Sequence, residues 1–69
     1  MKNVIAELNS APTYEAQYSY LYKVLPDLTL DNLLDLYLLL ATELDARNPE
    51  KENMLGITKS QILYLYNER

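Results

Sequence analysis

The chain contains no histidine and no cysteine, so carboxylates are its main candidates for acid–base chemistry. Without those two residue types, the usual pairs of nucleophile and base cannot be assembled. Asp31 and Asp35 are four residues apart and would lie on one face of a helix. However, the helix dipole favours acids in the first turns of a helix without any catalytic role. We therefore predict that the protein is not an enzyme.

Metal and phosphate sites are also not expected. Asp27 and the acids that follow it could supply oxygen ligands, but a calcium-binding loop needs a glycine at its sixth position and a glutamate at its twelfth. Asn32 and Leu38 occupy those positions. A phosphate-binding loop needs more than one glycine, and Gly56 is the single glycine of this chain. The sequence predicts neither a cofactor nor a metal.

The size of the chain favours association. Its 69 residues predict a single small helical domain, spanning residues 1–69. Domains of this size bury only about 60% of their unfolded surface and usually need a disulfide, a metal or a partner subunit. Because disulfides are excluded, we expect either a very well packed helical core or association with a partner.

The acidic residues are concentrated in one segment. Residues 27–52 hold seven acids and two bases, and the whole chain has a net charge of −4. Such a field repels phosphate and attracts cationic surfaces, so we expect a protein partner and not nucleic acid.

No membrane contact is expected. The longest apolar run, residues 36–41, is far shorter than the about 20 residues of a membrane span. The N-terminus is too short and too polar for a signal peptide. We expect the protein to be cytoplasmic.

Apolar spacing predicts an all-α fold, a small bundle of three main helices plus a short fourth. A short helix is expected over residues 3–9, and Pro12 then interrupts the chain. Residues 14–25 carry a helical stripe, which Pro26 should end. An alternating stripe, typical of a strand, runs through the same segment and is the alternative. The helical stripe consists of Tyr14, Tyr18, Leu21 and Leu25, and the alternating stripe of Tyr18, Tyr20, Tyr22 and Val24.

A third helix is expected from Leu30 to Arg47, with Thr29 or Asp27 as its cap, and the Asn48–Pro49 pair should stop it. Residues 49–55 should then form a short helical turn that ends at the glycine. Thr58 and Gln61 fit the capping-box pattern. The last helix is therefore expected over residues 60–68.

The third predicted helix carries more leucine than one face needs. Its expected core face covers an arc of roughly 120°, with Leu36 and Leu38 on the flanks and Leu39 opposite. We predict that Leu36 and Leu39 form a second contact face. Asp35 and Glu43 would be its rim, because interfaces place charge around apolar anchors. A single exposed leucine is the alternative. The expected core face consists of Leu30, Leu33, Leu34, Tyr37, Leu40, Ala41 and Leu44.

Seven tyrosines accompany a complete absence of phenylalanine and tryptophan. Tyrosine is enriched at interfaces because its ring offers contact area while its hydroxyl stays polar. Tyr20 lies off the main stripe of its helix, and we include it and Tyr22 among the predicted interface residues. The alternative for each is a half-buried place at the edge of the core.

Residues 48–69 partly resemble a helix-turn-helix, a DNA-binding motif with a glycine in its turn. Gly56 would be that glycine, and Lys51 and Glu52 depart from the small or apolar residues of the family's first helix. The resemblance implies that the start of the second helix contacts bases or phosphates. The apolar residues that fit the family are Leu55, Ile57, Ile62 and Leu65, and the implied contact residues are Thr58, Lys59, Ser60 and Gln61.

We therefore expect a non-enzymatic protein–protein interaction or regulatory protein, acting through a leucine- and tyrosine-rich helical face with an acidic rim. Its partner would be a second copy of the chain, in a dimer or a higher oligomer, or a cationic heterologous protein. The alternative is a small helix-turn-helix regulator that binds DNA.

Overall fold

The computed structural model describes residues 2–68 of the chain, with the backbone alone for Lys2. Its elements confirm the prediction of an all-helical chain, and no strand occurs in the described residues. Met1 and Arg69, the ends of the predicted domain, lie outside these residues. The elements are α1 (Lys2–Ser10), α2 (Tyr14–Val24), the 3₁₀ helix η1 (Leu25–Asp27), α3 (Leu30–Glu43) and α4 (Lys51–Asn67).

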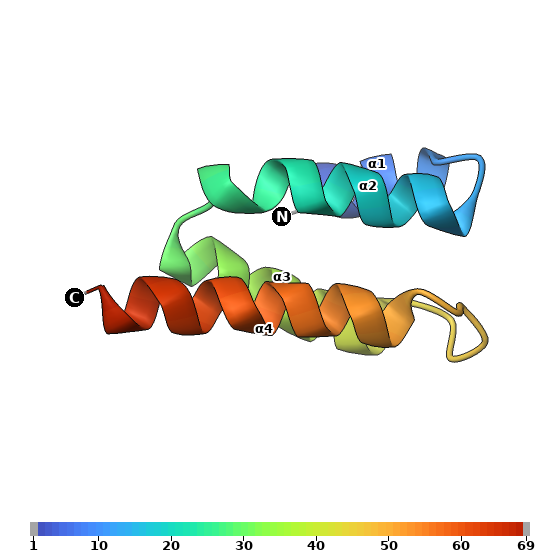
Figure 1. Ribbon diagram of the computed structural model, residues 1–69. Coiled ribbons are helices and arrows are strands. Elements are labelled where there is room, and N and C mark those ends of the chain that lie inside the picture. The colour runs from blue at the N-terminus through green and yellow to red at the C-terminus, as the bar shows by residue number, and fades with distance from the viewer. Residues whose placement is uncertain (1, 69) are drawn as a thin grey trace.

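The four α-helices lie in two layers (Figure 1). α1 and α2 pack side by side in one layer, and α3 and α4 in the other. The contact between α3 and α4 is the most extensive in the molecule, and α2 also contacts α4 across the layers. The molecule is elongated along the helices, with principal extents of 36 × 20 × 18 Å.

Threonine caps determine where α2 and α3 begin, and a proline determines where α2 ends. The Oγ1 atom of Thr13 accepts a hydrogen bond from the backbone N–H of Ala16 at 3.0 Å, which caps α2. Thr29 caps α3 in the same way, with the N–H of Asn32 at 3.2 Å, so Thr29 and not Asp27 is the cap. α2 ends before Pro26, as predicted, and the alternative of a strand in this segment is wrong.

The end of α3 differs from the prediction, because the helix stops at Glu43 rather than at Arg47. Leu44 turns to an extended conformation with φ −74° and ψ 138° and buries its side chain in the core. The carboxylate of Asp45 then accepts a hydrogen bond from the N–H of Arg47 at 2.8 Å. Hydrogen bonds of this kind between a side chain and a nearby backbone N–H compete with helical hydrogen bonds, which explains why α3 ends early.

Residues 51–67 form one continuous helix, so the predicted break at Gly56 is wrong. Gly56 is exposed, and its φ is not positive. Thr58 is not a cap either. Its side chain is fully buried, and its hydroxyl donates to the carbonyl of Met54 at 2.8 Å. A glycine inside a helix costs only about 1 kcal/mol relative to alanine, which the packing of α4 against α3 offsets.

One hydrophobic core draws on all four α-helices and on η1. It includes Leu36, whose side chain has no exposed surface. The core face of α3 is therefore rotated from the predicted one, toward Leu36 and away from Leu34 and Ala41, which are exposed. The buried apolar residues are Val4, Leu8, Leu21, Leu25, Leu33, Leu36, Leu40, Leu44 and Met54.

A polar cluster joins the two layers at the end of the molecule that carries the 11–13 and 44–50 loops (Figure 1). The side-chain amide of Asn48, only 6% exposed, donates to Gln17 Oε1 at 2.9 Å. Gln17 Nε2 donates in turn to the carbonyl of Leu8, also at 2.9 Å. Asn48 Oδ1 accepts from the N–H of Glu50 at 2.9 Å, at the start of α4. This chain of bonds ties α1, α2 and α4 to one loop.

Candidate protein-interaction surfaces

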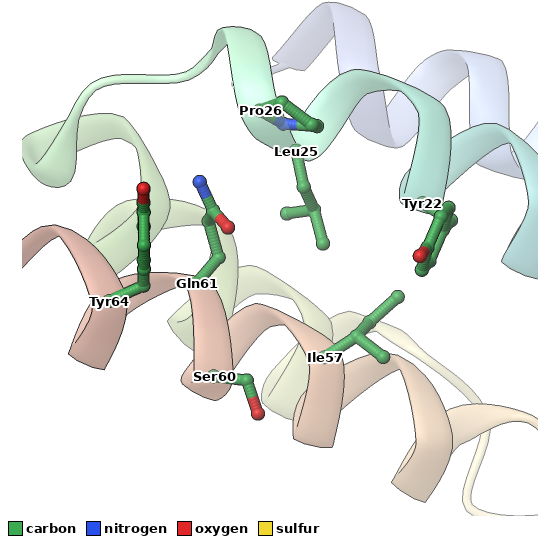
Figure 2. Close-up of a pocket in the computed structure, with 7 residues that line it drawn as sticks. All are labelled: Tyr22, Leu25, Pro26, Ile57, Ser60, Gln61 and Tyr64. Carbon is green, nitrogen blue, oxygen red and sulfur yellow. The ribbon is translucent and has the colours of Figure 1, made fainter.

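An open groove lies between the two layers, with α2 and η1 on one side and α4 on the other (Figure 2). Its volume is about 390 Å³. In Figure 2, the side chain of Leu25 points toward α4, and that of Ile57 points back toward α2. The residues that line the groove are Tyr22, Leu25, Pro26, Ile57, Ser60, Gln61 and Tyr64.

Two exposed tyrosines stand at the mouth of this groove. Tyr22 is 64% exposed and Tyr64 is 58% exposed, whereas Leu25 beneath them is almost fully buried. Tyr22 also stacks on Tyr18, one helical turn earlier, with ring centroids 6.3 Å apart and an interplanar angle of 25°. Gln61 adds an amide beside Tyr64. The groove therefore has an apolar floor, aromatic walls and a few hydrogen-bonding side chains, which is the usual composition of a binding site.

Acidic side chains flank the groove at its η1 end. Asp27 follows Pro26 directly, and Glu68 stands one helical turn after Tyr64, on the same side of α4. Both are exposed. Lys59, the basic residue in the middle of α4, lies nearly opposite Ile57 on the helix and points away from the groove. A cationic ligand would therefore meet favourable charge here.

The structure brings two of the predicted α3 residues together and excludes a third. Leu39, partly buried, and Glu43, exposed, line a second groove of about 330 Å³ between α1 and α3, which Ile5 helps to form. Leu36 lies in the core, so its place in the predicted contact face is wrong. Asp35 is exposed and lies one helical turn before Leu39, on the same side of α3, but it is not among the residues that line this groove.

The predicted tyrosine pair is divided between the core and the surface. Tyr20 is partly buried and packs against the core, as the alternative for that residue anticipated. Tyr22 is exposed in the groove between α2 and α4.

The four residues implied by the helix-turn-helix resemblance do not share a surface. Thr58 is buried against the core, so its predicted contact with DNA is wrong. Ser60 and Gln61 line the groove toward α2, whereas Lys59 is exposed on another side of α4. The physical reason is the missing turn, because a continuous α4 distributes consecutive residues around its axis.

Sequence reasoning missed a third surface, on the side of α3 and α4 away from α1 and α2. Leu34 and Leu38 on α3 are 48% and 64% exposed. Leu63 and Tyr66 on α4 are exposed to a similar degree. The signal was present, because Leu30, Leu34, Leu38 and Ala41 form a helical stripe. The prediction from sequence places three of these residues on the core face and Leu38 on its flank.

The described residues offer neither a metal-binding cluster nor a membrane-spanning helix. In residues 2–68, no three acidic side chains come together in a way that could hold a metal ion. None of the helices there combines the length and the apolar composition that crossing a bilayer requires.

Comparison with known proteins gave no match, whether against protein-family models, curated proteins or solved structures.

Proposed function

We propose that the protein is a non-enzymatic interaction or regulatory module that holds a cationic, partly apolar segment of another protein in the groove between α2 and α4. The observation that carries this proposal is the pair of exposed tyrosines, Tyr22 and Tyr64, above the apolar floor of Leu25 and Ile57. Exposed aromatic side chains around an apolar pocket are typical anchors of protein interfaces.

The charge around the groove supports a cationic partner. Asp27 and Glu68 lie at its η1 end, and the whole chain carries −4. Charges at the rim mainly accelerate encounter, and the apolar anchors mainly set the dissociation rate. An amphipathic helix with basic residues beside an apolar stripe fits this arrangement, because grooves between helices commonly receive such a helix.

Selection from a random peptide library against the full chain tests the proposal. Enriched peptides should combine basic residues with apolar or aromatic ones, and their affinity should fall as salt rises. Tyr64→Ala should weaken the enriched peptides about tenfold or more, as expected for an anchor residue. Tyr66→Ala is the matched control, because Tyr66 is as exposed as Tyr22 but lies on the other side of α4.

Two results would contradict the proposal. One is enrichment of acidic peptides, which would reverse the charge argument. The other is an equal loss of affinity in the Tyr64→Ala and Tyr66→Ala proteins, which would place the binding surface outside the groove.

A further inference from the structure

One end of the groove between α2 and α4 carries three different polar or aromatic side chains in a line along α4. Gln61, Tyr64 and Glu68 are separated by three and then four residues, so one face of the helix presents them in succession. Gln61 and Tyr64 line the groove, and both side chains point from α4 toward η1 in Figure 2. The η1 end of the groove therefore offers an amide, an aromatic ring and a carboxylate in sequence.

The side-chain amide of Gln61 is available to a ligand. Within residues 2–68 it makes no hydrogen bond, although the side chain is partly buried. The other glutamine, Gln17, uses both atoms of its amide, because it donates to the carbonyl of Leu8 and accepts from Asn48. Gln61 thus holds an acceptor oxygen and a donor nitrogen at the edge of the groove without a partner from the described chain.

The η1 end is negative, and the groove contains no cation of its own to neutralise it. Glu68 and Asp27 are both exposed, and Asp27 directly follows Pro26 on the opposite side of the groove. The C-terminal end of a helix favours positive charge, yet the last turn of α4 has no basic residue. Lys23 and Lys59 are not among the residues that line the groove. A cation supplied by a partner would therefore be stabilised here.

The mixture of groups favours a guanidinium over an ammonium. A guanidinium is planar and weakly hydrated, so it can stack on the ring of Tyr64 while its N–H groups reach the oxygen of Gln61 and the carboxylate of Glu68. An ammonium is a compact, strongly hydrated point charge with three donors and no plane to stack. Carboxylates alone attract both cations, so the ring and the amide are what distinguish between them.

The remainder of the groove fits the residues beside such an arginine. Ile57 lies one helical turn before Gln61 on the same face of α4, and Leu25 points toward α4 from the other side (Figure 2). An apolar residue one turn from the arginine, in a partner that is itself helical, would reach this apolar floor.

We propose that the η1 end of the groove is an arginine-binding subsite. The guanidinium stacks on Tyr64, donates to Gln61, and is neutralised by Glu68 and Asp27. This inference rests on the proposed function, because it names the cation that the groove holds, and it adds that arginine is preferred to lysine.

Nuclear magnetic resonance of the full chain, labelled with ¹⁵N, tests the subsite with two small probes, N-acetyl-arginine amide and N-acetyl-lysine amide. The arginine compound should shift the amide signals of Gln61, Tyr64 and Glu68, with an affinity about fivefold or more above that of the lysine compound. Equal affinities would overturn the preference for arginine. Shifts centred elsewhere on the chain, or none with either compound up to about 100 mM, would overturn the subsite.

Replacement of the ring tests the stacking contact. Tyr64→Leu keeps an apolar side chain but removes the aromatic face, so the affinity for the arginine compound should fall to about that for the lysine compound, which should change little. Tyr66→Leu is the control, because Tyr66 is also more than half exposed but lies on the other side of α4. A Tyr64→Leu protein that still prefers arginine, or a Tyr66→Leu protein that loses the preference equally, would contradict the proposal. Circular dichroism establishes that both variants fold.

The peptide selection described above separates this inference from the proposed function. Arginine should predominate among the basic residues of the enriched peptides. If lysine is as frequent as arginine, the cationic partner stands and the arginine subsite is wrong. If the enriched peptides contain no basic residues, the proposed function is wrong and the subsite fails with it.

Discussion

The two faces of α3 contain the same residue type in different surroundings. Leu33, Leu36 and Leu40 have no exposed surface, whereas Leu34 and Leu38 are 48% and 64% exposed. The inner leucines belong to the core that all four α-helices share, and they decide whether the chain folds. The outer leucines contribute little to folding of the single chain, because solvent still reaches them. Leucine content alone therefore does not distinguish a core from an interface, and the position of the neighbouring helices does.

Replacing one leucine on each face of α3 with alanine should give the largest difference in the free energy of unfolding. Leu36→Ala should lower the free energy of unfolding by about 2–5 kcal/mol, because it leaves a cavity in the core. Leu38→Ala should change it by less than about 0.5 kcal/mol in the single chain. Denaturant unfolding at low protein concentration, where any association contributes least, measures both. Equal losses would mean that Leu38 also belongs to the core.

Asn48 anchors the loop that follows α3 to α2 and to the start of α4. Asn48→Ala removes a donor to Gln17 and an acceptor for Glu50, leaving partly buried polar groups without these partners. We expect a loss of about 1–3 kcal/mol in unfolding free energy, measured by denaturant titration. Asn53→Ala is the control, because Asn53 is exposed in the first turn of α4. If Asn53→Ala is as costly, the polar cluster is not what orients the layers.

Gly56 gives a smaller test of the same kind on α4. It lies on an exposed side of this helix, and a Cβ added there would have no neighbouring atom within 4 Å. Gly56→Ala should raise the free energy of unfolding by about 0.5–1 kcal/mol, since alanine loses less backbone freedom in a helix. Thermal unfolding measures the change. A turn at this position, as the helix-turn-helix resemblance implied, would give destabilisation instead.

The boundaries set by local chemistry could be predicted from the sequence. A threonine with an extended backbone, such as Thr29, can cap the helix that follows it, and a proline such as Pro26 cannot continue a helix. These two effects are local, so tertiary packing has little influence on where α2 ends and α3 begins. The end of α3 was missed because burial of Leu44 depends on the rest of the core. Continuity through Gly56 was missed for a similar reason, since the contacts of α4 with α3 outweigh the cost of one glycine.

The candidate surfaces could be predicted only in part. Tyr22 was identified from composition, and the groove around it was not, because the groove is formed by α2 and α4 from distant parts of the chain. The leucine pattern of α3 indicated two apolar faces. Leucines cover so much of this helix that the pattern did not determine which face was inward, and Leu36 was placed on the wrong one.

The concentration dependence of thermal unfolding tests most directly whether the exposed face of α3, which carries Leu34 and Leu38, serves association. If the folded chain pairs through this face, its Tm should rise with protein concentration, because mass action favours the paired state. Leu38→Glu should remove that dependence while leaving the Tm at low concentration nearly unchanged, since Leu38 is exposed in the single chain. A wild-type Tm that stays constant from about 1 µM to about 1 mM would contradict a role in association. A Leu38→Glu protein whose Tm still rises in parallel with that of the wild type would place the association elsewhere.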